Sequence, residues 1–337
     1  MQENNKPGII LRVEDLSKIF TAKNTQVRAV NDVSFSVVKG ETVGIVGESG
    51  CGKTTLGRCI VKAHDATSGK VLYKAANSVE YDLQNISKSD LKKIRKEVQM
   101  IFQDPYSSLD PRMTVFDIIS EPLKPNFKGA EKEAMEERVK NVAEKVGLNP
   151  SYLKRYPHAF SGGQRQRIGI ARALVTYPRL IVCDEAVSAL DVSVQAQVIN
   201  LLKELQREMD LTYLFISHDL SVVEHISDRV GVMYLGQMVE YAETDELFSA
   251  PCHPYTEALL SAVPIADPSV TLERIPLTGE IPNPADVPSG CFFHTRCKYS
   301  QKICETEPVT LIEHRPKHFV ACHRVNELAL QGIPPLE

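Results

Sequence analysis

The sequence predicts an α/β protein built around a parallel sheet, and three segments carry this prediction. An apolar strand at Thr42–Val46 runs into a glycine-rich loop and then into a helix that begins at Lys53. A second apolar strand, Leu180–Cys183, is followed by two acidic residues, and a third, Leu211–Asp219, carries a histidine at its end. Since open parallel sheets place their ligands at the carboxyl ends of the strands, we expect these polar residues to lie at one edge of the sheet.

Composition and charge limit the class of protein. The chain has 337 residues, of which 43% are hydrophobic, which is enough for one large domain with an appendage or for two domains. Its net charge of -4 gives no electrostatic reason to expect a nucleic-acid partner. The start, MQENNKPG, lacks the features of a secretory leader, and no run of about 18 apolar residues occurs. We therefore expect a cytoplasmic protein whose membrane association comes through partners.

The segment GESGCGKT, from Gly47 to Thr54, has the pattern of a phosphate-binding loop. Glycine lets successive backbone N–H groups turn toward one phosphate, Lys53 reaches the β and γ oxygens, and the Thr54 hydroxyl is placed to hold Mg²⁺. A glycine turn before an ordinary helix is the structural alternative, and Cys51 is expected only to fill space. The predicted nucleotide contacts are Gly47, Glu48, Ser49, Gly50, Cys51, Gly52, Lys53, Thr54 and Thr55.

Polar residues at the ends of the other strands predict the rest of a catalytic site. Asp184 and Glu185 suit a metal ligand and a base for an attacking water, although such a pair can also cap the next helix. Another short apolar strand is expected to end at Gln103, and this side chain is expected to touch the metal or the water. We expect His218 to reach the γ-phosphate and Glu185, the alternative being a surface or capping histidine.

The segment FSGGQRQRIGIARAL, from Phe160 to Leu174, predicts a second anion-binding site. Ser161, Gly162 and Gly163 stand at the beginning of a helical run, where backbone N–H groups are exposed at the positive end of the helix dipole. The chain therefore has two phosphate cradles more than a hundred residues apart.

Together these motifs resemble the ATP-binding cassette (ABC) family over nearly the whole chain. The resemblance implies a P-loop ATPase (RecA-like) α/β core with an antiparallel β-subdomain, an inserted α-helical subdomain at about residues 90–160 and a small C-terminal extension. It also implies a head-to-tail dimer, in which the signature FSGGQ of one cassette closes over the nucleotide held by the other. The second cradle then serves the γ-phosphate of the neighbouring cassette.

Residue roles are carried over from the family only at matching positions. SALD at Ser188–Asp191 matches the D-loop, and Ala186 stands where proline is usual, which is expected to loosen that turn. Phe20 is the candidate for stacking on adenine, with a core phenylalanine as the alternative. The resemblance implies ATP and Mg²⁺, with Lys53, Gln103, Glu185 and His218 as catalytic residues, Thr54, Gln103 and Asp184 around Mg²⁺, and Ser161, Gly162, Gly163, Gln164 and Asp191 at the dimer site.

The expected helical subdomain contains a core-facing helix and a docking loop. Met135, Val139 and Val142 recur at helical spacing, and Gly147 suits the end of that helix. The loop Asp104–Met113 is expected to expose Tyr106 and Leu109. The family resemblance implies that the surface beside this loop receives a coupling helix from a membrane subunit, whereas an ordinary turn is the alternative.

Longer stretches such as YPHAFSGGQRQRIGIARAL and ISHDLSVVEHISDRVGVMYLGQMVE resemble the ATPases of dipeptide and oligopeptide permeases, of the DppF/OppF type. This resemblance implies a cassette at residues 1–250 and an extension at residues 251–337, which begins with PCHPYTEALLSAVPIADP. It implies uptake of di- or oligopeptides together with a second, different ATPase subunit (DppD/OppD-like), two transmembrane permease subunits and an extracytoplasmic solute-binding protein. The expected location is the cytoplasmic face of the inner membrane, through the permeases.

Four cysteines gather in the extension, with five, six and seventeen residues between successive sulfurs. In a cytosolic chain such clustering favours metal or redox chemistry over disulfides, but the spacing decides neither for zinc nor for an iron–sulfur cluster. Four histidines, His294, His314, His318 and His323, are candidates to compete as ligands. Resemblance to the peptide-permease ATPases implies a structural [4Fe–4S] cluster on Cys291, Cys297, Cys304 and Cys322, with zinc and free thiols as alternatives.

Other functions are less well supported by the sequence. A soluble cassette protein acting on ribosomes or DNA is disfavoured because the chain has one cassette, no long heptad insertion and no basic excess. A GTPase is disfavoured because no N-K-x-D motif follows the phosphate loop. The cargo is not determined by this chain, and related permeases carry nickel, glutathione or oligosaccharides as well as peptides.

Overall fold

The structure is a computed structural model that describes residues 8–22, 25–104, 106, 108–124, 132–264 and 274–333. The chain forms two compact units. Of the described residues, one unit contains those up to Leu11, Val37–Glu41 and those within Tyr73–Ile216, and the other contains those within Arg12–Ser36, Thr42–Leu72 and those from Ser217 onward. The first seven residues, Pro105, Ser107 and Ile265–Pro268, which belong to segments considered in the sequence, lie outside the described residues.

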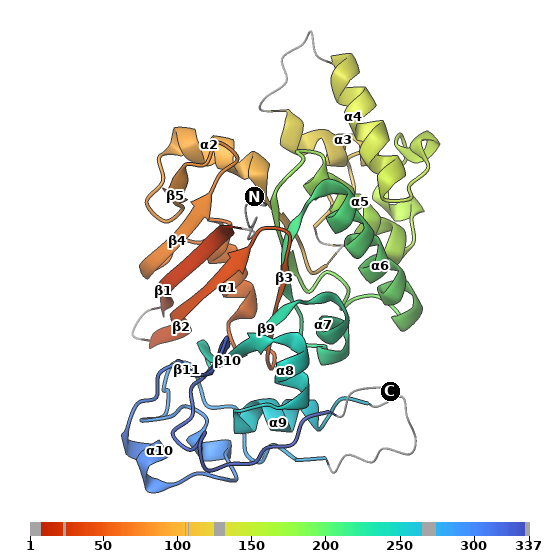
Figure 1. The fold of residues 1–337 in the computed structure, drawn as a ribbon. Helices are drawn as coiled ribbons and strands as arrows, with labels where there is room; N and C mark the ends of the chain where they lie inside the picture. The colour runs from red at the N-terminus through yellow and green to blue at the C-terminus, as the bar shows by residue number, and fades with distance from the viewer. Residues whose placement is uncertain are drawn as a thin grey trace, which may run out of the picture. The chain divides into compact units, whose positions relative to one another are not determined.

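Parallel strands form the sheet of the first unit (Figure 1): β6 (Val98–Ile101), β7 (Leu180–Asp184) and β8 (Thr212–Ile216). β7 is the middle strand, with Leu180 opposite Val98 on one side and opposite Thr212 on the other. Every residue of β7 and β8 is buried, as expected for parallel strands, which read as continuous apolar runs. The predicted strands are present, but β6 ends two residues before Gln103 and β8 ends two residues before His218, where each strand was expected to end.

Helices of the first unit are built around α5 (Gly162–Leu174), which packs against α3 (Val115–Ser120), α4 (Lys132–Lys145) and α6 (Val192–Met209). In α4 the predicted stripe is buried at Val139 and Val142, whereas Met135 is half-buried. The remaining elements of this unit are β5 (Glu80–Asp82), α2 (Lys88–Glu97) and 3-10 turns at Glu121–Leu123, Pro150–Tyr152 and Pro157–Ala159.

The second unit contains most of three neighbouring strands, in the order β2-β1-β4: β1 (Ile9–Ala22), β2 (Thr25–Val38) and β4 (Ser68–Lys74). Its other strands follow the order β11-β12-β10-β9-β3: β3 (Thr42–Val46), β9 (Arg229–Tyr234), β10 (Gln237–Glu243), β11 (Ile312–Arg315) and β12 (His318–Val320). β3 and β9 are parallel, and the later pairs are antiparallel. Its helices are α1 (Lys53–Ile60), α7 (Leu220–Ile226), α8 (Thr244–Ser249), α9 (Pro254–Leu260), the 3-10 turn His294–Arg296 and α10 (Lys302–Thr306).

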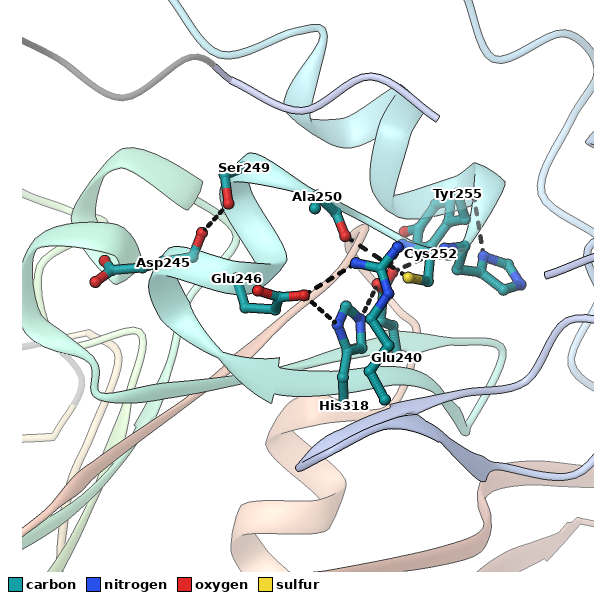
Figure 2. A network of polar contacts seen from close by, with 10 residues as sticks. Glu240, Asp245, Glu246, Ser249, Ala250, Cys252, Tyr255 and His318 are labelled. Atoms are coloured by element: carbon teal, nitrogen blue, oxygen red, sulfur yellow. Dashed lines mark hydrogen bonds and ion pairs between the residues drawn. The ribbon is translucent and has the colours of Figure 1, made fainter. Parts of the chain in front are cut away.

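The C-terminal extension shares this sheet, because β12 pairs with β10 and places Val320 opposite Glu240. Figure 2 shows the polar network at this junction. The buried Glu240 carboxylate accepts hydrogen bonds from the backbone N–H groups of Cys252 at 2.6 Å and His253 at 3.0 Å, and it contacts His318 Nε2 at 2.7 Å. Burial alone lowers the pKa of His318, but contacts with Cys252 and Glu240 outweigh this effect and raise it to about 10. The network thus joins β10, the segment before α9 and β12.

Within the described ranges, no helix combines the length and the hydropathy needed to cross a membrane.

Candidate nucleotide-binding site

The phosphate loop in the second unit connects the buried strand β3 to α1, as the sequence predicts. Gly47 has φ +147° and Gly52 has φ +106°, values that side chains other than glycine rarely adopt. A Cβ atom on Gly47 would lie 2.2 Å from the Met233 carbonyl oxygen, and one on Gly52 would lie 2.0 Å from that of Ala29. Glycine is therefore required at both positions by backbone conformation and by close packing.

Lys53 is buried at the first position of α1, and its ammonium group turns back onto the loop. Its Nζ donates hydrogen bonds to the carbonyl oxygens of Gly47 at 2.7 Å and Glu48 at 3.0 Å. Backbone N–H groups at such a helix start favour an anion. Cys51 is buried within the loop, and burial raises the pKa of its thiol, which agrees with a space-filling role.

Two of the predicted catalytic residues meet in the first unit. Asp184 is the buried last residue of β7, and Glu185 follows it with φ +47°. Gln103 lies two residues beyond β6, and its Nε2 donates a hydrogen bond of 2.8 Å to Glu185 Oε2. The exposed His218 follows β8 in the chain and belongs to the second unit, as do Phe20 and the phosphate loop.

The signature segment forms the start of α5 in the first unit. Ser161 is its N-cap, and a capping box joins it to Gln164, with N···O distances of 3.1 and 3.4 Å. A Cβ atom on Gly163 would lie 2.6 Å from Val194 of α6, so a small residue is required there. Asp191 caps α6 by accepting a hydrogen bond from the Val194 backbone N–H at 3.0 Å. The predicted signature and D-loop thus begin two helices that touch each other.

Two exposed aromatic side chains correspond to predicted contact surfaces. The Phe20 ring on β1 is 38% exposed, meets the edge of His64 at 5.7 Å and has Lys18 Nζ 4.8 Å from its centroid. Tyr106, in the predicted docking loop, is 60% exposed, and the Arg165 guanidinium covers its ring at 4.2 Å. The expectation that Leu109 is exposed is wrong, because this side chain packs into the core and is only 2% exposed.

All four cysteines of the extension line one cavity, together with His253, His294 and His323. Burial raises the pKa of Cys291 to about 11 and that of Cys322 to about 12. The sequence grouped His318 with this cluster, but that histidine instead contacts Glu240. Among the described residues, the metal-type ligand atoms that lie within 4.8 Å of one another belong to Glu240, Cys252 and His318, and the four cysteine sulfurs are not grouped this closely.

Sequence reasoning missed two residues that contact the phosphate loop. Arg296 binds the Glu48 carboxylate with N···O distances of 2.7 and 3.1 Å, and the Tyr255 hydroxyl accepts a hydrogen bond from the Glu48 N–H at 2.9 Å. Both residues lie more than 200 positions from Glu48, and although Tyr255 lies in the quoted segment PCHPYTEALL, no local pattern links either residue to the phosphate loop.

Comparison with known proteins gives two family matches: ABC transporter over residues 30–188, and the oligopeptide/dipeptide transporter C-terminal region over residues 239–304. The chain is 54% identical over 324 residues to the oligopeptide transport ATP-binding protein AppF of Bacillus subtilis (strain 168), covering 93% of this chain and 97% of that protein. It is 48% identical over 328 residues to OppF of Haemophilus influenzae, covering 96% of each. The dimeric ATP-binding cassette MJ0796, solved with ADP and Pi, superposes with a TM-score of 0.62 at 26% identity, covering 70% of this chain and 99% of that one.

The chain belongs to the ATP-binding cassette family of ATPases. Within that family it combines the cassette with the C-terminal region of oligopeptide and dipeptide transporters. The predicted α/β ATPase fold is confirmed, and ATP is the nucleotide of this family.

Proposed function

We propose that this chain is the ATP-hydrolysing subunit of an importer that carries di- or oligopeptides across the cell membrane. The observation that carries the proposal is the combination, in one chain, of the cassette and the oligopeptide/dipeptide transporter C-terminal region. Relatives that match almost their full length are named oligopeptide transport ATP-binding proteins, which supports the same cargo class. We assign the cassette to residues 1–250, its helical subdomain to about residues 90–160, and the extension to residues 251–337.

The residues assigned to hydrolysis act on the triphosphate and on a water molecule. The amides of the phosphate loop and Lys53 bind the β- and γ-phosphates. Thr54, Gln103 and the buried Asp184 offer the hard oxygen ligands that suit Mg²⁺, which supplies charge neutralisation at the phosphates when bound. Glu185 orients or deprotonates the attacking water, and its hydrogen bond from Gln103 holds the carboxylate in place. His218 stabilises charge on the γ-phosphate.

The signature acts on the nucleotide of a neighbouring cassette. Ser161, Gly162 and Gly163 present a hydroxyl group and helix-start amides to that γ-phosphate, Gln164 completes the capping box, and Asp191 lies in the adjoining D-loop. We propose a second, different ATPase subunit (DppD/OppD-like) as the neighbour. Two transmembrane permease subunits and an extracytoplasmic solute-binding protein complete the importer, so the chain works at the cytoplasmic face of the membrane.

For the cysteine cluster we propose a structural [4Fe–4S] centre held by Cys291, Cys297, Cys304 and Cys322. The four cysteines share one cavity, which supports a common ligand. The four thiolates would hold the cluster, and the resemblance to the peptide-permease ATPases favours it over zinc as their common ligand. The centre would hold the segments of the extension together.

The experiment that tests the importer assignment is purification of the tagged chain from gently solubilised membranes of its own cell, with mass spectrometry of the retained proteins. We expect two permeases, a second cassette ATPase and the solute-binding protein to be retained. Tyr106→Ser should lose the permeases while ATP binding is kept, since Tyr106 belongs to the proposed docking loop. Tyr177→Ser is the matched control, because Tyr177 is also exposed and also lies under an arginine, Arg138, at 4.0 Å.

Retention of ribosomal or DNA-repair proteins without any membrane protein would contradict transport while leaving the ATPase assignment intact. If both tyrosine variants lost the permeases equally, the result would contradict the assignment of the docking loop but not the importer function.

A further inference from the structure

The C-terminal extension reaches the phosphate loop through Arg296. This arginine lies in the short 3-10 turn His294–Arg296, between two of the clustered cysteines. Its side chain is 4% exposed, and its two terminal nitrogens bind the two carboxylate oxygens of Glu48 at 2.7 and 3.1 Å. Such fork-shaped pairing fixes the orientation of both planar groups as well as their distance.

Glu48 is also held through its backbone. Its N–H donates to the hydroxyl of Tyr255, a fully buried side chain of α9, at 2.9 Å, and its carbonyl oxygen accepts from Lys53 Nζ at 3.0 Å. The amide, the carbonyl and the carboxylate of one loop residue are therefore all engaged. Two of these three contacts come from the extension.

Aromatic side chains surround Arg296 and its contact with Glu48. Its guanidinium lies 5.8 Å from the ring centroid of Tyr234, and the Phe293 ring packs against Tyr234 at 5.2 Å and against Tyr255 at 5.3 Å. Arginine is always protonated in proteins, and here its charge is paired with the Glu48 carboxylate. A buried charge that loses its partner is strongly destabilising, so the pair acts as a unit.

Charge explains why the contact bears on function as well as on folding. A carboxylate within a loop that binds phosphates repels its ligand unless it is neutralised. Arg296 neutralises Glu48 and at the same time holds the first half of the loop in place. Loss of Arg296 would leave a negative charge free to face the nucleotide.

We propose that Arg296 is a positioning residue for nucleotide binding, through which the C-terminal extension sets the affinity of the phosphate loop for ATP. The proposal rests on the assignment of residues 47–55 as the ATP site. It gives the extension a role in the nucleotide chemistry, in addition to holding its own fold.

The test is titration of the purified full-length chain with MgATP by calorimetry, which gives the dissociation constant and the binding stoichiometry separately. We expect Arg296→Gln to raise the dissociation constant at least about tenfold, with a stoichiometry close to that of the natural chain. Arg296→Lys keeps the positive charge but cannot make the two-pronged contact with the carboxylate. Its dissociation constant should lie between those of the natural chain and of Arg296→Gln. Arg315→Gln is the matched control, since Arg315 pairs with Glu246 in the same extension and does not touch the loop.

A double-mutant cycle tests whether Arg296 acts through Glu48. In a Glu48→Gln background, Arg296→Gln should change the dissociation constant far less than it does in the natural chain. If the two substitutions change the dissociation constant by independent factors that multiply in the double variant, the proposal is overturned. A lower stoichiometry at an unchanged dissociation constant would also overturn it, because that result indicates a purely structural role. If Arg296→Gln gives no folded protein, Arg296→Lys and Glu48→Gln form the same cycle. A natural chain that does not bind MgATP, or a Lys53→Ala variant that binds as well, would instead refute the assignment of the loop.

Discussion

The Glu240–His318 pair makes the stability of the second unit depend on pH. The pKa of His318 is about 10 in the folded chain against an ordinary value of 6.5, so folding favours its protonated form. The contribution of the contacts of His318 with Cys252 and Glu240 is therefore fully present below pH 6.5 and is lost as the pH rises through 10. We expect His318→Gln to lower the free energy of unfolding by about 3–5 kcal/mol at pH 6, and by much less near pH 10.

Urea unfolding followed by circular dichroism at the two pH values measures this difference. His314→Gln on the neighbouring strand β11 is the control and should cost little at either pH. A loss that is the same at pH 6 and near pH 10 would show that His318 contributes packing rather than an ionic contact.

At the scale of secondary structure, the start of α5 combines a stabilising cap with the proposed site for a neighbouring nucleotide. Ser161→Asp separates the two roles, because aspartate caps a helix about as well as serine but places a negative charge beside the γ-phosphate. We expect the melting temperature and MgATP binding by the variant chain itself to stay unchanged. ATP hydrolysis by the assembled transporter should fall at least about tenfold.

Ser161→Ala is the comparison for this prediction, since it removes the cap and should cost about 1 kcal/mol of stability. Weakened MgATP binding by the isolated Ser161→Asp chain would mean that the signature acts on its own nucleotide, contrary to the proposal.

Some of the strands could be predicted from the sequence and others could not. Strands β3, β7 and β8 were predictable because each is a buried apolar run followed by a polar motif. The three-residue strand β12 was not, because its partner β10 lies far away in the chain. The helix caps Ser161 and Asp191 could be expected from local sequence, since serine and aspartate are favoured at helix starts. The burial of Leu109 could not, because it depends on tertiary packing.

At the scale of the whole molecule, the missed contacts all join distant parts of the sequence. Arg296 lies 248 positions from Glu48, and His318 lies 78 positions from Glu240. Local patterns hold no information on such pairs, because the choice of partner depends on how strands and turns pack. The residues proposed to bind ATP follow local motifs, but the residues that contact those motifs from distant parts of the chain do not.

The extension is attached to the sheet through β12, and it has a candidate metal centre at the four cysteines. The contributions of the strand pairing and of the centre can therefore be tested separately. We expect the chain, purified without oxygen, to contain about four iron and four sulfide ions per molecule. Cys304→Ser should lose both, because it removes a proposed thiolate ligand that is buried in the cavity. Cys59→Ser, which alters a buried cysteine of α1, should retain them.

Iron and sulfide analysis, with electron paramagnetic resonance of the reduced protein, measures the content of the centre. One zinc ion per chain without sulfide would contradict the iron–sulfur proposal, and so would a Cys304→Ser variant with undiminished iron. Because β12 is joined to β10 by backbone pairing that includes no cysteine, Cys304→Ser should still keep the β10–β12 hydrogen bonds protected from exchange. Loss of that protection would mean that the centre, and not the sheet, holds the extension on the cassette.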